Sequence, residues 1–248
     1  MTRPPVLQRE IPAQQREVAA VGLPKMQQVA PGEWLRVDEA YEAQLAEKAR
    51  LLRKREADVL ALLPEAQDAA AELLTVVLAE IAMRNDFKLE AGGIRRPDGK
   101  LVDPDPRRPL RTLAALVQED FCLLMKEGDE HVLKGALLCF PASWTLAEKI
   151  GRPLLRIHAP VPDYDPSIAA RVQRLFDGVQ PGRPIWRANL LEYHDPALHH
   201  PRREGEGARD TSGDPQYERS ERQTVLKLPG TGAVVFSIHT TIARKKAG

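Results

Sequence analysis

The chain has 248 residues, of which 43% are hydrophobic, and its 36 Lys and Arg against 35 Asp and Glu give a formal net charge of +1. This balance argues against a nucleic-acid-binding protein, because such a protein shows a basic patch or stripe. No apolar stretch approaches the roughly 20 residues that a membrane-spanning helix needs, so we expect a soluble protein without a membrane partner.

The N-terminus and the cysteines bear on the compartment and the redox chemistry. The first residues lack the apolar core of a signal peptide, so we expect a cytoplasmic protein. Cys122 and Cys139 lie in apolar segments, which predicts reduced, buried thiols and leaves too few cysteines for an iron–sulfur cluster. A dinucleotide fingerprint is also missing, since Val235 stands where the nearest match needs its third glycine.

The N-terminal part predicts an arm followed by two helices. Prolines punctuate residues 1–33, which favours an extended arm. Helix formers run from Asp38, a good N-cap, to Leu63, and Pro64 ends this run while starting a second helix. Apolar residues recur at helical spacing along both: Tyr41, Leu45, Ala49, Leu52, Leu73, Leu74, Val77, Leu78 and Ile81. The two helices would form an antiparallel pair or cover a sheet, and core packing accounts for their stripes.

The middle of the chain predicts a loop and a β-hairpin. Gly, Pro, Asp and Arg fill residues 85–109, so we interpret this segment as a mobile loop over the site. A short helix follows over 110–117. Strands are predicted at Phe121–Met125 and His131–Phe140, where Pro141 ends the second one.

A capped helix and a framed histidine follow the hairpin. Thr145 and Glu148 fit a capping box, and Gly151 with Pro153 ends this short helix. The apolar residues Leu154, Leu155 and Ile157 then lead to His158, which precedes an Ala-Pro-Val-Pro segment held extended by its prolines. Spacing alone makes such a histidine a core or turn residue more often than a ligand.

The C-terminal part predicts a helix at 167–176, a strand at Ile185–Arg187 and a closing hairpin of 223–228 with 233–240. Residues 195–215 read as a loop, and a metal site among the nearby His194, His199 and His200 is disfavoured because no carboxylate has matching spacing. These elements predict an α+β fold with an antiparallel sheet.

Several segments resemble the haem-dependent oxidative N-demethylase family in one order from about residue 20 to residue 242. The central one is Phe-Pro-x-x-Trp-x-Leu-x-Glu-Lys-Ile-Gly at 140–151, followed by Ile-His-x-Pro-Val-Pro at 157–162. The other matching segments are Gly22-Leu23-Pro24, Trp34-Leu35, 118–124, Trp186-Arg187-x-Asn189, 221–224, Leu228-Pro229 and Val235-Phe236-x-Ile238. The chain departs from the family at Leu190, where an aromatic is expected, and at His239-Thr240-Thr241, where Arg-Thr-Tyr is expected.

The resemblance implies a PAS-like antiparallel sheet with the N-terminal helices packed around it. Residues 34–242 would form a single haem domain that includes both helices, between the arm at 1–33 and a tail at 243–248. The implied reaction is oxidative removal of an N-methyl group from a small amine, using haem b, dioxygen and two electrons. Because the chain shows no reductase motif, a separate electron-transfer reductase would supply the electrons; the oligomeric state is left open.

The resemblance also implies a set of site residues. His158 would be the axial ligand, with Trp144 also in contact with the haem, and Arg187 or Arg222 would pair with its propionates. Glu221 and Asn189 would face the amine, because a protonated amine needs a carboxylate near the iron. A surface strand position is an equally good interpretation of the two arginines, as is structural capping for Glu221 and Asn189.

Two other functions compete with this one. A haem-PAS sensor or gas-binding module would bind haem without catalysis, but it predicts an output domain, and none is evident. A haem-free interaction protein would leave His158 without a ligand role and would make the proline segment after it merely structural.

Overall fold

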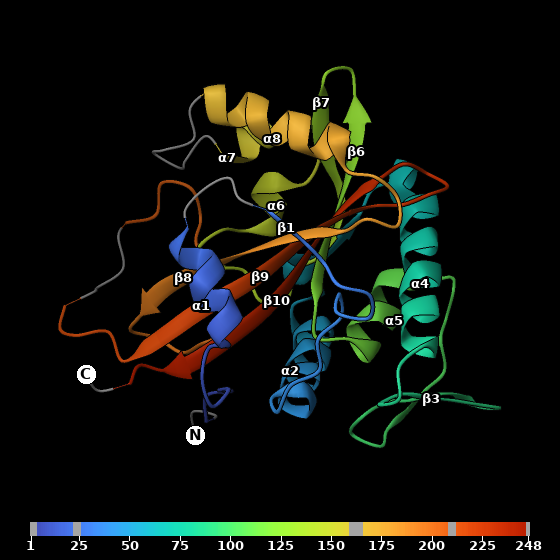
Figure 1. The fold of residues 1–248 in the computed structure, drawn as a ribbon, viewed down its shortest axis with the longest axis horizontal. Coiled ribbons are helices and arrows are strands. Elements are labelled where there is room, and N and C mark those ends of the chain that lie inside the picture. The colour runs from blue at the N-terminus through green and yellow to red at the C-terminus, as the bar shows by residue number, and fades with distance from the viewer. Residues whose placement is uncertain (1–3, 22–25, 159–165, 208–211, 247–248) are drawn as a thin grey trace.

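A computed structural model describes residues 4–21, 26–158, 166–207 and 212–246. Its centre is a seven-stranded sheet in the order β1-β8-β9-β10-β6-β7-β2, with antiparallel pairing between all neighbours (Figure 1). The strands are β1 (Gln27–Gln28), β2 (Leu60–Leu62), β6 (Asp120–Glu127), β7 (Glu130–Leu137), β8 (Ile185–Tyr193), β9 (Tyr217–Lys227) and β10 (Val234–Arg244). The predicted α+β class with an antiparallel sheet is confirmed.

Helices cover both faces of this sheet. They are α1 (Ala13–Ala20), α2 (Tyr41–Lys54), α3 (Glu56–Val59), the 3₁₀ turn η1 (Pro64–Ala66), α4 (Gln67–Ala82), α5 (Pro109–Leu116), α6 (Leu146–Lys149), α7 (Leu154–His158) and α8 (Pro166–Gly178). Figure 1 shows α7 and α8 on one side of the sheet and α2, α4 and α5 on the other. We call these the α7 face and the α4 face.

Each face has its own apolar cluster, because alternate residues of a strand project to opposite sides. On the α4 face, Leu123, Leu226 and Val235 pack in one cluster with the apolar stripes of α4 and α5. On the α7 face, Cys122 and Val225 pack with residues of the covering helices, namely Leu146, Leu154 and Phe176. The α4 stripe is largely as predicted, with Leu73, Leu74, Val77 and Ile81 buried.

The predicted hairpins are present, and most strands run further than predicted. β9 and β10 pair over their full lengths, and β8 pairs with β9 as far as Tyr193. Polar side chains interrupt the apolar pattern of β8 and β9. They form hydrogen bonds with one another across the two strands, and the backbone pairing continues past them. β7, in contrast, ends at Leu137 instead of Phe140, because the Phe140 N–H donates to the carboxylate of Asp120 at 2.6 Å.

The first predicted helix, 38–63, is interrupted at Arg55 and is wrong over its last four residues, 60–63. α2 ends at Lys54, and after α3 the chain forms β2, an edge strand that pairs with β7. The residue before a proline disfavours helical backbone, which fits an extended chain just before Pro64. Gly135 permits this pairing, since a Cβ there would lie 2.7 Å from Cδ1 of Leu62.

Three further local predictions differ from the structure. Residues 85–109 are not a loop over the site, because they contain the small sheet of β3 (Lys88–Glu90), β4 (Gly93–Arg95) and β5 (Leu101–Val102), which adjoins α5 on the α4 face. The arm at 1–33 is not extended throughout, since it includes α1, which packs against β8. The Thr145 hydroxyl donates to the Glu148 carboxylate instead of capping a backbone N–H.

Among the described helices, none has the length and apolar character needed to cross a membrane.

Candidate functional site

His158 is the last residue of α7 and is half-buried over the α7 face. Its Nδ1 lies 2.9 Å from the carbonyl oxygen of Leu154, an acceptor, so Nδ1 carries the proton of the neutral ring and Nε2 carries the lone pair. Burial lowers the pKa of His158, and the nearby charges of Lys149 and Arg187 lower it further. The ring is therefore neutral at pH 7. The proline segment at 159–162 lies outside the described residues.

A row of polar side chains crosses β8 and β9 on the same face. Arg187 pairs in register with Gln223, and Asn189 pairs with Glu221, so all four project to the side of Val225 and the α7-face cluster. The Arg187 Nε–H donates to Oε1 of Gln223 at 2.8 Å. Burial lowers the pKa of Arg187, and among the described residues it has no ion-pair partner. Arg187 is thus a partly buried cation with unused donors.

The Glu221 carboxylate accepts three hydrogen bonds. The side-chain amides of Asn189 and Gln223 donate to Oε2 at 3.3 Å and 3.0 Å, and Arg219 Nη2 donates to Oε1 at 3.3 Å. Asn189 Oδ1 in turn accepts from the backbone N–H of Glu221 at 2.8 Å. The structure therefore brings the two predicted amine-facing residues into direct contact. Arg219 was not predicted, because the residues of β9 from Glu218 to Thr224 are all polar and this arginine does not stand out among them.

Trp144 lies at the start of the chain that leads into α6. It is partly buried and packs against the α7-face cluster, as do Ile150 and Ile157. Ile157 is the residue before His158. The tryptophan and the histidine therefore belong to the same covering layer of the α7 face.

Arg222 does not join this group. It pairs with Ala188 and His239 in register and projects to the α4 face, where its guanidinium stacks 3.8 Å from the ring centroid of Trp186. It donates to the Glu33 carbonyl at 3.1 Å, and its buried Nε–H has no partner among the described residues. Burial lowers its pKa to about 10. The structure places the two predicted propionate partners on opposite faces.

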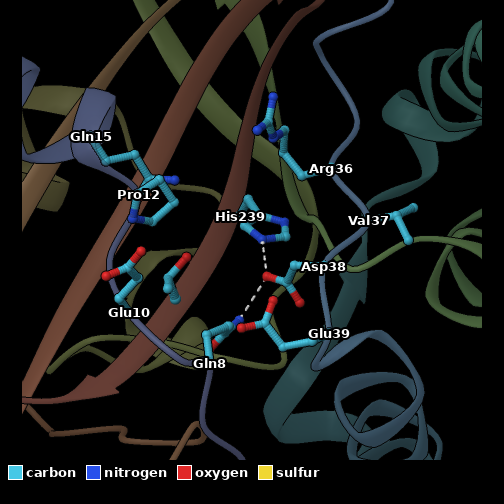
Figure 2. A pocket seen from close by; sticks show the side chains of 10 residues that line it. Gln8, Glu10, Pro12, Gln15, Arg36, Val37, Asp38, Glu39 and His239 are labelled. Atoms are coloured by element: carbon cyan, nitrogen blue, oxygen red, sulfur yellow. Dashed lines mark hydrogen bonds and ion pairs between the residues drawn. The ribbon is translucent and has the colours of Figure 1, made fainter.

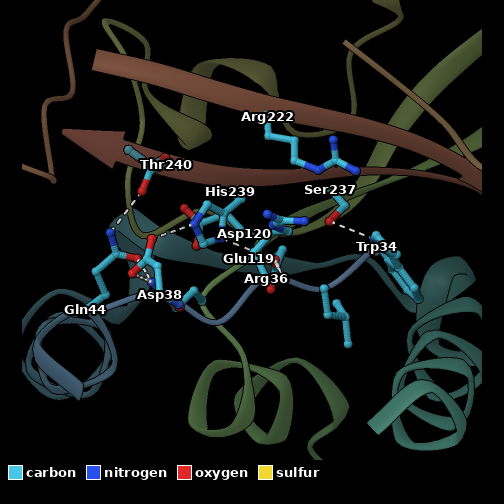
Figure 3. A network of polar contacts seen from close by, with 12 residues as sticks. Trp34, Arg36, Asp38, Gln44, Glu119, Asp120, Arg222, Ser237, His239 and Thr240 are labelled. Carbon is cyan, nitrogen blue, oxygen red and sulfur yellow. Dashed lines mark hydrogen bonds and ion pairs between the residues drawn. The ribbon is translucent and has the colours of Figure 1, made fainter. Parts of the chain in front are cut away.

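His239 lies in a buried polar network on the α4 face (Figure 3). Nε2 donates to Asp38 at 3.0 Å and Nδ1 donates to Glu119 at 3.3 Å. Burial opposes a charge on this ring, but the hydrogen bonds to the two carboxylates outweigh it and raise the pKa of His239 to about 9. A protonated ring with both nitrogens donating offers no lone pair to a metal.

A cavity of about 70 Å³ adjoins this network on the α4 face (Figure 2). Its walls come from the N-terminal segment around Gln8, from Arg36 to Glu39 and from His239 and Thr241 of β10. Sites for cofactors and other organic ligands usually measure hundreds of cubic ångströms, so this cavity does not fit a haem.

His199 and His200 have structural partners, and both cysteines are buried. His199 Nδ1 donates to the carbonyl of Cys139 at 2.9 Å, and His200 is buried against the ring of Tyr193. Burial raises the pKa of both cysteine thiols. Within the described part of the chain, no group of three or more His, Cys, Asp and Glu side chains is arranged to hold a metal ion.

The α7 face combines three features that a haem protein uses: a cluster of apolar side chains, an imidazole held through its second nitrogen, and a cation that could pair with a propionate. A family model for haem-dependent oxidative N-demethylases, alpha subunit-like, matches residues 25–246. The chain belongs to this family. Membership in the haem-dependent oxidative N-demethylase family associates the chain with haem-dependent oxidative chemistry. The matched region includes every candidate site residue and begins after α1.

Proposed function

We propose that this chain binds haem b on the α7 face and oxidatively removes an N-methyl group from a small amine. The observation that carries the proposal is the placement of His158, Trp144, Arg187 and the Glu221 row on one face of the sheet. Their joint position is compatible with one cofactor and one substrate. Bound there, haem would supply the centre at which dioxygen is reduced and the methyl carbon is oxidised.

The residues of the α7 face would hold the haem and keep water away from it. His158 presents Nε2 while the Leu154 carbonyl holds Nδ1, which fixes the ring orientation that an axial ligand needs. Arg187 pairs its unused N–H donors with a propionate, since a guanidinium matches a carboxylate in bidentate geometry. Trp144 adds apolar contact area, and the cluster beneath α6, α7 and α8 excludes water from the reacting atoms.

Glu221 and Asn189 would orient the amine. A carboxylate has about four lone-pair positions, and three are filled by Asn189, Gln223 and Arg219, which leaves one for an N–H of a protonated amine. Held in this way, the substrate would keep its methyl group in a fixed direction. Electrons would come from a separate reductase.

The test has two stages on the same purified protein. Haem is added and the Soret band is recorded; then dimethylamine, dithionite-generated reducing equivalents and oxygen are supplied and formaldehyde is measured. The proposal expects a Soret band and formaldehyde in proportion to amine consumed. A Soret band without formaldehyde from any of a panel of methylamines would indicate a gas-binding or sensor protein, and the absence of haem binding would refute both functions.

A further inference from the structure

Among the residues that the structure describes, Arg219 on β9 has one of the largest side chains that are fully buried. It projects to the α7 face, two residues from Glu221 on the same strand. A guanidinium in the interior is stable only when it is paired and hydrogen-bonded, because loss of hydration costs several kcal/mol. The partners of Arg219 therefore show what this residue does.

Those partners come from three separate segments. Nη2 donates to the Phe140 carbonyl at 2.6 Å, Nη1 donates to the Leu198 carbonyl at 3.1 Å, and Nη2 also contacts Oε1 of Glu221 at 3.3 Å. The guanidinium also lies 5.8 Å from the ring centroid of Tyr193, within cation–π range. One side chain thus joins the end of the first hairpin, the segment after β8 and the candidate amine-binding carboxylate.

The two loop segments that Arg219 joins also hold each other. The Ser143 N–H donates to the His200 carbonyl at 2.9 Å, and the His200 N–H donates to the Pro141 carbonyl at 3.3 Å. Ser143 has a φ of 64°, in the left-handed region that residues other than glycine rarely adopt. Such a conformation persists only where its surroundings determine it, and Trp144 follows directly.

We propose that Arg219 is the positioning residue of the site: it fixes the direction of the Glu221 carboxylate and holds the strained turn that presents Trp144. This inference deepens the proposed function and rests on it for the role of Glu221. The geometry of the turn does not depend on that role. Because one guanidinium serves both groups, a substitution that removes its charge and its donors alters amine recognition and the cofactor-covering loop together.

The experiment uses Arg219→Met, which keeps the length of the side chain and removes its donors. Amide exchange at Ser143 and His200 is followed by ¹H–¹⁵N NMR, with and without haem, and dimethylamine affinity is read from the Soret shift of the haem-loaded protein. We expect exchange at both amides to accelerate more than about tenfold and amine affinity to fall about tenfold. Wild-type protection at both amides, together with an affinity within about twofold of wild type, would overturn the proposal.

The matched control is Arg16→Met. Arg16 pairs with Glu218 at 2.5 Å, so this variant removes an arginine–glutamate pair on the adjacent residue of β9, away from the site. It should leave both readouts unchanged; equal changes in the control would show a general loss of stability and refute a positioning role.

Two more variants keep the test decisive if Arg219→Met does not fold. Arg219→Lys retains the charge beside Glu221 but cannot reach three acceptors, so it should keep amine affinity and lose amide protection. The pair Arg219→Met with Glu221→Gln removes both buried charges and should fold while the turn stays unprotected. Wild-type protection in either variant would contradict the proposal. If wild-type protein fails to bind haem, the proposed function fails while the exchange data still decide whether Arg219 holds the turn.

Discussion

Arg187 and Arg222 occupy adjacent strands but project to opposite faces of the sheet, because Arg222 pairs with Ala188, the neighbour of Arg187. Only Arg187 shares a face with His158. We therefore expect Arg187→Met to weaken haem retention by about tenfold, since it removes the cation available to a propionate. Arg222→Met is the matched control, and it should keep the Soret band. Haem titrations of both variants measure the difference, and a larger loss in Arg222→Met would place the cofactor on the α4 face.

His158 and His239 differ in what their ring nitrogens do. His158→Ala should remain folded but lose the wild-type Soret band, and added imidazole should restore a ligated spectrum because it replaces the missing side chain. His239→Ala should keep the band. It should nevertheless lower the free energy of unfolding by roughly 3 kcal/mol, because it leaves buried carboxylates without their partner. Spectra and urea titrations of the two proteins separate these effects; a lost band in His239→Ala alone would reverse the assignment.

The ion pairs of His239 predict a decline of stability at alkaline pH. The pKa of His239 is raised from its ordinary 6.5 to about 9, so the folded state binds its proton more tightly than the unfolded state. The resulting stabilisation is fully present below pH 6.5 and is lost as the pH rises towards 9. Its size is on the order of 3 kcal/mol. Urea unfolding between these limits should show this slope, and His239→Gln should flatten it. A slope unchanged by the substitution would assign the effect to another group.

Cys139 is expected to pack and not to ligate iron. Its side chain is fully buried, and burial raises the pKa of the thiol, which opposes the thiolate that iron would need. Cys139→Ser should therefore keep the Soret position while it lowers stability by about 1–2 kcal/mol for an imperfectly bonded hydroxyl. Loss of the band in a folded Cys139→Ser protein would make the sulfur a ligand.

Electron supply gives the last prediction. The purified chain, loaded with haem, should show no sustained NADPH-driven turnover, because its sequence contains neither a dinucleotide fingerprint nor the cysteines for a cluster. Formaldehyde should form with a chemical reductant or an added reductase. Rapid NADPH oxidation coupled to product by the chain alone would contradict this expectation.

The sequence predicted the elements in which apolar residues recur with the spacing of a strand or a helix. The β6–β7 hairpin and the α4 stripe follow from alternation and helical periodicity, which need no knowledge of the rest of the chain. The buried stripe of α2 was predicted only in part. It includes Gln44 and Lys48, which were not expected, whereas Ala49 is exposed. Lys48 is buried because its ammonium lies 3.0 Å from the Asp120 carboxylate, a partner far away in the sequence.

Prediction of the candidate site was limited in the same way, because it too depends on contacts between residues far apart in the sequence. The motifs drew attention to His158, Arg187 and Glu221, but the face to which each strand residue projects depends on register, which the sequence did not fix for β8 and β9. This is why Arg187 and Arg222 were interpreted as equivalent. Arg219 was not predicted for a related reason. Two of its acceptors are backbone carbonyls, which every residue has, so the residue types of these partners could not indicate the contact.

The short β1 strand has a consequence for how the molecule behaves towards its own copies. β1 pairs with Ile185 and Trp186 at the start of β8, and Val18 of α1 packs against the side chains of Trp186 and Ala188. Without β1, the backbone N–H and C=O groups at the start of β8 would be left open, and an open strand edge is a template for pairing with another chain. β1 thus protects this end of the sheet from pairing with a second copy of the chain, and its loss would favour aggregation without a direct change to the α7 face.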